Sequence, residues 1–211
     1  MNARRILLVR HGQSTWNAER RWQGQADPPL TDAGLAQARS AIAAATAAGP
    51  FAGVGSSTLE RASRTAEILA EGLGLPAPTP EAGLMERSAG EWEGLTRVEI
   101  DRRYPGAVAA WRTPPGFESD DDLLARIVPA LTRLAETMPG DLPVLAVTHG
   151  GVMYSLEERR GAGRHLGRID NLDARWVEVG GDRPDQVVPV GDRISLATPV
   201  DGAQPTPPGY V

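Results

Sequence analysis

Short apolar runs, each followed at once by polar residues, are the clearest pattern along the chain. Residues 6–9 are wholly apolar, residues 143–147 form a second run, and residues 51–55 form a weaker one. Such runs are short for a helix and lack the alternation of a half-buried strand, so they indicate strands buried on both faces of a parallel sheet. We expect two further strands near residues 176–179 and 194–196.

Between these strands the apolar residues recur every three or four positions, which predicts helices with one buried face. Thr31 is placed to cap one helix, Gly72 ends another, and the acidic residues before Leu123 suit the start of a third. Residues 97–104 and 151–160 are predicted to form two more. The apolar positions that define the three longer helices are Leu35, Ala38, Ile42 and Ala45; Leu59, Ala62, Ala66, Leu69 and Leu73; and Leu123, Ile127, Leu131 and Leu134.

This alternation of strands and helices predicts an α/β fold, a three-layer α/β/α sandwich with a mostly parallel central sheet. The chain has 211 residues, which suits a single domain, and we place that domain at residues 1–198. Residues 199–211 are rich in proline and are expected to be a disordered C-terminal tail.

The amino-acid composition excludes several catalytic mechanisms and types of site. All 22 basic residues are arginine, and the chain has neither lysine nor cysteine. It therefore cannot use a Schiff-base lysine, a Walker-type phosphate loop, a cysteine nucleophile, a disulfide or a cysteine–zinc site. The three histidines are His11, His149 and His165, which leaves little room for a histidine-rich metal centre.

Charge and hydropathy narrow the choice of partners. The net charge of −5 argues against binding to nucleic acid or to an anionic membrane surface. No apolar run approaches the roughly 18 residues that a membrane span requires. The basic start of the chain precedes only the short run at 6–9, whereas the apolar core of a signal peptide has about 7–15 residues. We therefore expect a cytoplasmic protein with no membrane and no nucleic-acid partner.

Polar residues that follow the predicted central strands are the candidates for function. The first strand ends in Arg10 and His11, and the third ends just before His149. The second leads through Ser57 to Arg61 in the first turn of a helix. Ligands of open parallel sheets bind beyond the carboxyl ends of the strands, so these side chains converge if the strands are neighbours. A lone histidine after a strand is more often structural, but arginines, histidines and backbone N–H groups together indicate a phosphate site.

Five sequence blocks contain these residues. They are LVRHGQS at 8–14 with Asn17, LTDAGLAQA at 30–38, STLERASRTA at 57–66, LME at 84–86 with GEWEG at 90–94, and THGG at 148–151. In order and spacing they resemble the histidine phosphatase superfamily, also called the phosphoglycerate mutase-like family, over roughly residues 4–155. Asn171, before a predicted strand, fits the same resemblance.

The resemblance implies a two-step phosphoryl transfer. His11 would be the nucleophile and would form a phosphohistidine. Glu86 would protonate the leaving oxygen and then activate water as a base. Glu91 and Glu93 are alternatives for this acid, and Glu86 is preferred because of its position in the motif.

The resemblance also implies which residues surround the substrate. Arg10, Arg61 and His149 would contact the phosphoryl oxygens and stabilise their charge. The family needs no metal and no cofactor for this chemistry. The residues expected to bind substrate are Asn17, Gln23, Gly24, Arg87, Gly150 and Gly151.

Three activities stay open. Water as the acceptor makes a phosphatase, whereas a hydroxyl group of a bound sugar acid makes a mutase. Only 63 positions separate Glu86 from His149, and the cofactor-dependent mutases carry a longer insertion there that excludes water, so a phosphatase is favoured. A non-catalytic phospho-ligand module is disfavoured because the catalytic residues are all present.

The substrate is expected to be a small phosphorylated metabolite that the sequence does not name. Arg20, Arg21 and Arg87 could bind a carboxylate, which would suit molecules similar to phosphoglycerate. Met85 stands where many relatives have arginine, and Phe117 replaces a glycine of a common loop; both departures lie on the expected substrate side. A homodimer is a further expectation, because relatives are often dimers.

Overall fold

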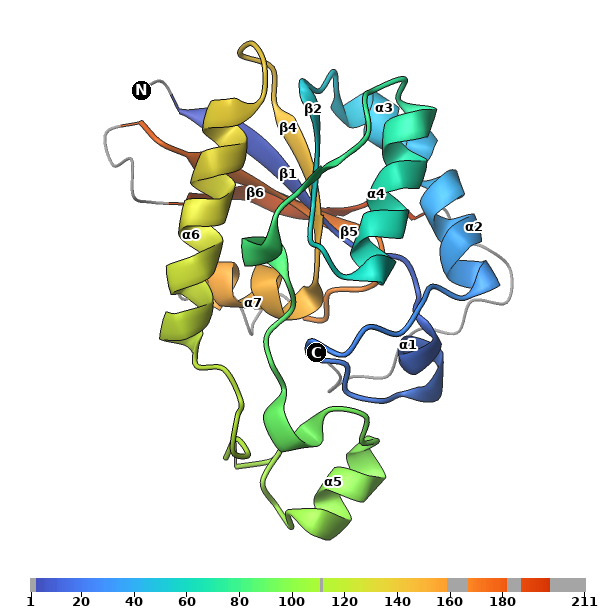
Figure 1. The fold of residues 1–211 in the computed structure, drawn as a ribbon, viewed down its shortest axis with the longest axis vertical. Helices are drawn as coiled ribbons and strands as arrows, with labels where there is room; N and C mark the ends of the chain where they lie inside the picture. The colour runs from blue at the N-terminus through green and yellow to red at the C-terminus, as the bar shows by residue number, and fades with distance from the viewer. Residues whose placement is uncertain (1–2, 111, 159–166, 182–186, 198–211) are drawn as a thin grey trace.

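The computed structural model describes residues 3–110, 112–158, 167–181 and 187–197. Within them, six strands form one sheet in the order β3-β2-β4-β1-β5-β6 (Figure 1). Neighbouring strands among β1 to β4 are parallel, whereas β5 runs antiparallel to β1 and β6 antiparallel to β5. The mostly parallel sheet is therefore confirmed. The strands are β1 Arg4–Arg10, β2 Gly53–Ser56, β3 Thr79–Pro80, β4 Val144–Thr148, β5 Asp173–Val179 and β6 Val187–Ser195.

Helices cover both faces of this sheet, which confirms the three-layer sandwich (Figure 1). One face carries α6 and α7, and the other carries α2, α3 and α4. Below the carboxyl ends of the parallel strands lie α1 and α5. The helices are α1 Thr15–Glu19, α2 Asp32–Ser40, α3 Ile42–Ala48, α4 Glu60–Gly72, α5 Arg97–Arg103, α6 Asp120–Thr137 and α7 Gly150–Glu158, with two 3₁₀ helices, η1 Ala82–Leu84 and η2 Gly90–Trp92.

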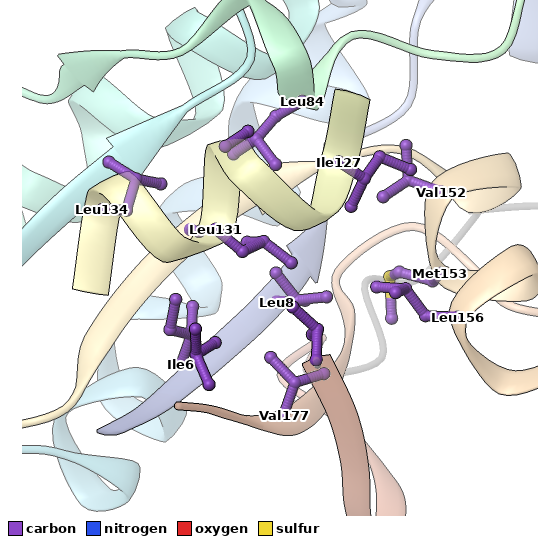
Figure 2. Packing of buried hydrophobic residues seen from close by; sticks show 14 of the residues in the cluster. Ile6, Leu8, Leu84, Ile127, Leu131, Leu134, Val152, Met153, Leu156 and Val177 are labelled. Atoms are coloured by element: carbon purple, nitrogen blue, oxygen red, sulfur yellow. The ribbon is translucent and has the colours of Figure 1, made fainter. Parts of the chain in front are cut away.

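Strand β1 shows how the apolar runs produce the two cores. Side chains alternate across a strand, so Ile6 and Leu8 enter the core beneath α6 and α7, while Leu7 and Val9 enter the core beneath α3 and α4. All four are fully buried. Figure 2 shows the first of these cores, with Leu131 of α6 lying beside Leu8. A strand buried on both faces is what the uninterrupted apolar run predicts.

The predicted elements begin and end close to where the sequence places them, with two differences in extent, whereas α1, β3 and the two 3₁₀ helices were not predicted. Thr31 caps α2, since its hydroxyl oxygen accepts from the N–H of Gly34 at 3.0 Å. The sequence predicts one helix through Ala45, whereas a turn at Ala41 divides it into α2 and α3. Strands β5 and β6 are longer than predicted, because buried and partly exposed positions alternate along them and no continuous apolar run marks their length.

A small lobe extends beyond the carboxyl edge of the sheet (Figure 1). We define the α5 lobe as residues 88–110 and 112–118, which include η2 and α5. Its small core joins Trp92 and Ile100 of the lobe to Trp22 from the segment after α1. The rings of Trp22 and Trp92 meet edge to face with centroids 5.0 Å apart, so Trp22 is a packing residue.

Some predictions concern residues outside the described ranges. His165 and the predicted tail at 199–211 are among them. The division into a domain at 1–198 and a tail therefore stays a prediction. Among the helices that the structure does describe, none is long and apolar enough to cross a membrane.

Candidate active site

The carboxyl ends of β1, β4 and β2 lie side by side, and the structure brings the candidate side chains together there. Arg10 at the end of β1 is in register with Thr148 at the end of β4, and β2 pairs with the other side of β4. The N–H of His11 continues this pairing by donating to the carbonyl of Thr148 at 3.0 Å. As a result, the rings of His11 and His149 stand edge to face with centroids 5.1 Å apart.

The ring of His11 is held in one tautomer. Its Nδ1 lies 2.6 Å from the carbonyl oxygen of Gly12, so Nδ1 carries the proton and donates it to that oxygen. Its Nε2 accepts from Nε of Arg61 at 3.3 Å. Burial, followed by the charges of Arg61 and Arg10, holds the pKa of His11 well below its usual value. The imidazole is therefore neutral at neutral pH, with the lone pair of Nε2 facing the cations.

Two buried arginines supply positive charge beside His11. Arg61 is fully buried and donates to the carbonyls of Ala26 at 2.7 Å and Gly24 at 2.9 Å. Burial lowers the pKa of Arg61 to about 10, so the guanidinium remains charged at neutral pH. Arg10 donates to the carbonyl of Ile169 at 2.5 Å, and its Nε is buried without a hydrogen-bond partner among the described residues.

His149, like Arg10, has a buried nitrogen that lacks a hydrogen-bond partner among the described residues. Its Nε2 lies 2.8 Å from the hydroxyl oxygen of Ser57, which also accepts from the N–H of Leu59. The hydroxyl of Ser57 can therefore donate its hydrogen bond to Nε2 of His149. In that arrangement Nε2 is the acceptor, and the ring proton of His149 is on Nδ1. That Nδ1 is buried and finds no partner within the described part of the chain. Buried polar atoms are normally paired, so the unpaired Nδ1 of His149 and Nε of Arg10 indicate donors for a ligand.

Glu86 reaches this region from the segment after η1. Its Oε2 accepts from the N–H of Gly151 at 3.1 Å, and its Oε1 accepts from the N–H of Arg87 at 2.7 Å. A Cβ at Gly151 would lie 2.3 Å from Oε1 of Glu86, so this approach requires glycine. The N–H of Gly151, predicted to contact substrate, is thus bonded to the Glu86 carboxylate, while Gly150 lies against the guanidinium of Arg10.

The two alternative carboxylates are engaged elsewhere. Glu91 is exposed and accepts from the hydroxyl of Tyr104. Glu93 accepts from the N–H groups of Gln25 at 3.0 Å and Ala89 at 3.2 Å, which joins the α5 lobe to the segment after α1. Neither shares the bond that Glu86 makes to α7.

Three of the predicted substrate-binding residues form one side of the site, around α1. Asn17 and Ser14 together cap α1, and the N–H of Ser14 donates to the side-chain oxygen of Asn17 at 3.2 Å. Gln23 accepts from the hydroxyl of Ser14 at 2.6 Å. Gly24 adopts a φ of 53°, which favours glycine, and turns its carbonyl toward Arg61. The contacts of these residues therefore hold the α1 segment and Arg61 in place.

The three arginines considered for a substrate carboxylate have different surroundings. Arg87 forms an ion pair with Asp120, and its guanidinium also donates to the hydroxyl of Ser155 at 2.5 Å. Arg21 pairs with carboxylates, including that of Glu99 at 3.2 Å, and so ties the α1 segment to α5. Arg20 is exposed at the end of α1.

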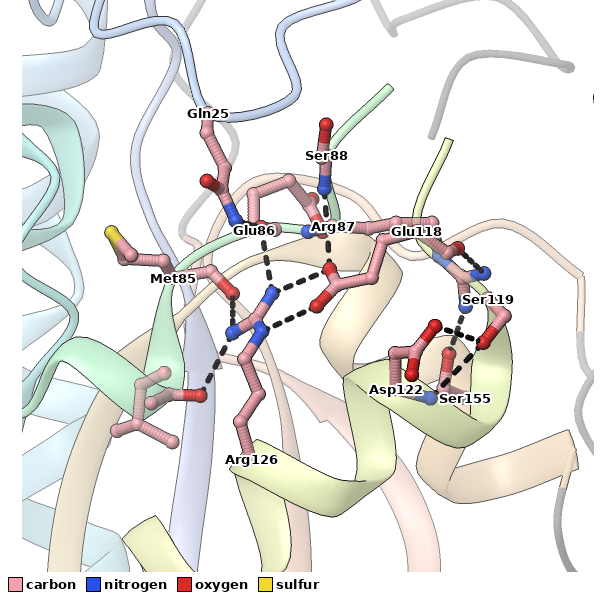
Figure 3. A network of polar contacts seen from close by, with 12 residues as sticks. Gln25, Met85, Glu86, Arg87, Ser88, Glu118, Ser119, Asp122, Arg126 and Ser155 are labelled. Atoms are coloured by element: carbon pink, nitrogen blue, oxygen red, sulfur yellow. Dashed lines mark hydrogen bonds and ion pairs between the residues drawn. The ribbon is translucent and has the colours of Figure 1, made fainter. Parts of the chain in front are cut away.

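Three further residues support the site, and the sequence pattern assigned none of them a role. In the sequence, Ser57 is only the polar end of a predicted strand. Asn171 fits the family resemblance without an assigned role, and in the structure its side-chain amide donates to the carbonyl of His11 at 2.8 Å. Arg126 has no signal in the sequence, because an arginine within a helix is usually solvated. Its contacts with the Glu86 segment appear in Figure 3.

No metal site accompanies this arrangement in the part of the chain that the structure describes. There, no group of three or more histidine, aspartate or glutamate side chains is arranged to hold a metal ion. The described cluster is instead one of arginine and neutral histidine beside the carboxylate of Glu86, with the exposed Asp27 pairing with Arg61 at 3.8 Å, and this arrangement suits an anionic ligand.

Comparison with known proteins agrees with this arrangement. Residues 6–186 match the histidine phosphatase superfamily (branch 1). The chain is 39% identical over 168 residues to glucosyl-3-phosphoglycerate phosphatase of Mycobacterium tuberculosis, covering 74% of each chain. It is 38% identical over 164 residues to 2,3-bisphosphoglycerate-dependent phosphoglycerate mutase of a Methylobacterium species, covering 72% of this chain and 78% of the mutase.

A solved structure extends the likeness to the fold. The mycobacterial glucosyl-3-phosphoglycerate phosphatase in complex with VO3 superposes with a TM-score of 0.76 at 32% identity, covering 90% of this chain and 99% of that one. The resemblance read from the five sequence blocks is therefore confirmed. The chain belongs to the histidine phosphatase superfamily, and its fold is that of the phosphoglycerate mutase-like phosphatases.

Proposed function

We propose that the chain is a metal-independent phosphomonoesterase that passes the phosphoryl group of a small metabolite to His11 and then to water. The observation that carries this proposal is the state of His11, a buried neutral imidazole whose Nδ1–H is bonded to Gly12 and whose Nε2 faces Arg61. A histidine nucleophile needs an unprotonated nitrogen directed at phosphorus. The positive charge that phosphoryl transfer requires comes from Arg10 and Arg61.

In the first step, the lone pair of His11 Nε2 attacks phosphorus as the bond to the leaving oxygen breaks. Glu86, as a carboxylic acid, gives its proton to that oxygen. In the second step, the Glu86 carboxylate takes a proton from water, the water oxygen attacks phosphorus, and the N–P bond breaks to release phosphate. Arg10, Arg61 and His149 stabilise the charge on the transferring group in both steps.

This two-step reaction has a direct test. The wild-type protein should release phosphate from p-nitrophenyl phosphate and should form an acid-labile phosphoenzyme when quenched during turnover. His11→Ala should lose both, and Glu86→Gln should keep the phosphoenzyme while slowing its hydrolysis. Absence of phosphate release from every phosphomonoester tried would instead favour a non-catalytic phospho-ligand module.

The acceptor decides between a phosphatase and a mutase. Relatives of both kinds resemble the chain, so similarity alone does not choose. As far as the structure describes them, the 63 positions from Glu86 to His149 contain the α5 lobe, α6 and β4, and such a short connection supports access of water. We therefore propose a phosphatase. Isomerisation of 3-phosphoglycerate that outruns its hydrolysis in the presence of 2,3-bisphosphoglycerate would reverse this choice.

For the substrate, we propose a phosphoester that carries a carboxylate. The names of both curated relatives contain phosphoglycerate, and Arg87 is the cation adjacent to Glu86 in the chain. Because Arg87 already pairs with Asp120, a carboxylate would share that guanidinium. Arg87→Ala should reduce the preference for 3-phosphoglycerate over glycerol phosphate. A preference unchanged in this variant would remove the carboxylate from the proposal.

Two further parts of the proposal concern location and assembly. We propose a cytoplasmic location, which fractionation of the source cells would test. We also propose a homodimer, which light scattering on the purified protein would test. A particle with the mass of one 22.4 kDa chain would exclude the dimer.

A further inference from the structure

We propose that Arg126 of α6 is a positioning residue for the acid, holding the Glu86 backbone in the place from which its carboxyl group reaches the leaving oxygen. Arg126 lies 40 positions beyond Glu86 in the sequence, but the two residues meet in the fold (Figure 3). The inference rests on the role proposed for Glu86, and its experiment separates the two.

The guanidinium of Arg126 binds three carbonyl groups of one segment. Its Nη1 donates to the carbonyls of Gly83 at 2.9 Å and Met85 at 2.7 Å. Its Nη2 donates to the carbonyl of Glu86 at 2.9 Å. The segment at 85–88 belongs to neither a helix nor a strand, so regular secondary structure does not satisfy its carbonyl groups. The side chain of Arg126 therefore holds this segment in place, whereas pairing between strands holds His11 and His149.

Glu118 fixes the guanidinium from the opposite side. Nε and Nη2 of Arg126 donate to the two carboxylate oxygens of Glu118 at 2.7 and 2.8 Å. A bidentate pair of this kind defines the plane of the guanidinium as well as its position. Glu118 is also bonded twice to Ser88. The Glu118 carboxylate accepts from the N–H of Ser88 at 3.2 Å, and the N–H of Glu118 donates to the carbonyl of Ser88 at 3.0 Å. The pair thus holds the chain both before and after Glu86.

These contacts also show how Arg126 acts. Its three guanidinium nitrogens all donate to Glu118 or to the carbonyls of residues 83, 85 and 86, so it acts through Glu86 and not as a phosphate ligand. A misplacement of about 1 Å in a reacting group can cost on the order of 100-fold in rate. A modest shift of the Glu86 backbone should therefore slow the step that needs the proton.

The leaving group provides the readout. A nitrophenolate leaves without a proton, whereas an alkoxide needs one, so only the alkyl ester depends on the acid. We expect Arg126→Met to lower kcat/KM for glycerol phosphate about 10–100-fold, while kcat/KM for p-nitrophenyl phosphate changes only a few-fold. The matched control is Arg133→Met, which removes an arginine seven positions later on α6 that also forms an ion pair, with Glu81. It should leave the ratio of the two substrates unchanged.

A double-mutant cycle with Glu86→Gln completes the test. If Arg126 acts through the acid, its removal from the Glu86→Gln protein should cause little further loss on glycerol phosphate. Equal losses on both substrates, or losses that multiply in the double variant, would overturn the inference. If Glu86→Gln itself lowers kcat/KM equally for both substrates, the role proposed for Glu86 as the acid fails instead. If Arg126→Met does not fold, Glu118→Gln is the second variant. It should lower kcat/KM for glycerol phosphate more than for p-nitrophenyl phosphate, by a smaller factor than Arg126→Met. Equal factors for the two esters in Glu118→Gln would also overturn the inference.

Discussion

The proposed site joins two regions that are built in different ways. The sheet edge, by which we mean Arg10, His11 and His149, follows β1 and β4 directly and takes its geometry from the register of those strands. The acid segment, residues 85–88, lies outside the sheet and is held by side chains and N–H groups from α6 and α7. Main-chain pairing fixes the nucleophile, and side-chain contacts fix the acid.

This difference predicts how damage in each region will appear. The sheet edge provides the nucleophile and the charge for phosphoryl transfer, which every phosphomonoester needs. In the phosphorylation step, which kcat/KM reports, the acid segment provides a proton that only a strongly basic leaving oxygen needs. Substitutions at the sheet edge should therefore slow all substrates alike, and substitutions at the acid segment should discriminate between them.

Loss of the nucleophile should give the largest effect. We expect His11→Asn to reduce kcat/KM on the order of 10⁴-fold or more for p-nitrophenyl phosphate and glycerol phosphate alike, because the nitrogen that accepts the phosphoryl group is removed. Steady-state hydrolysis of both esters measures it, with a thermal melt to verify folding. A loss confined to glycerol phosphate would contradict the division between the two regions.

Removal of Arg61 should come next. Its guanidinium is fully buried beside His11, and loss of a cation that stabilises a transferring phosphoryl group costs about 10³-fold or more. We expect Arg61→Met to slow both esters by this order. The control is Arg64→Met on the same helix, where an exposed arginine pairs with Glu67. That variant should behave as wild type, and comparable losses in the two variants would argue against a special role for Arg61.

The two regions also differ in how far the sequence predicts them. Continuous apolar runs located β1 and β4, and the rule for parallel sheets then placed His11 and His149 together. Glu86 followed from the family resemblance alone, since no periodic pattern marks its segment. Arg126 could not be predicted, because the backbone carbonyls that it binds come within reach only when α6 packs against η1. Side-chain contacts of this kind depend on tertiary structure and leave no local pattern.

A substitution at Gly151 should have a smaller and more selective effect. A Cβ there would lie 2.3 Å from Oε1 of Glu86, so Gly151→Ala must displace the carboxylate. We expect kcat/KM for glycerol phosphate to fall about 10–100-fold, and p-nitrophenyl phosphate to be affected far less. Gly150→Ala is the comparison, since its Cβ would lie 3.7 Å from Arg10, at ordinary contact distance. Any loss that it causes should be equal for the two esters, and selectivity in Gly150→Ala would undermine the argument.

The smallest expected effect is on stability, and it concerns the two histidines of the sheet edge. Burial, with the charges of Arg61 and Arg10, lowers the pKa of His11 and His149 well below 6.5. Unfolding exposes both rings and restores a pKa of about 6.5. Below that pH the unfolded chain binds protons that the folded chain does not, so the free energy of unfolding is fully present above about pH 6.5 and declines as the pH falls.

Urea unfolding measures this decline. The midpoint should fall between about pH 7 and pH 5.5 in the wild-type protein, and the fall should be weaker in His149→Gln and weakest when His11→Asn is added. This order is expected because each imidazole that is kept neutral in the folded protein makes the unfolded chain bind up to one more proton than the folded chain at low pH. An unchanged slope in the double variant would show that the two rings are not held neutral in the folded protein, and the nucleophile proposed at the sheet edge would lose its lone pair.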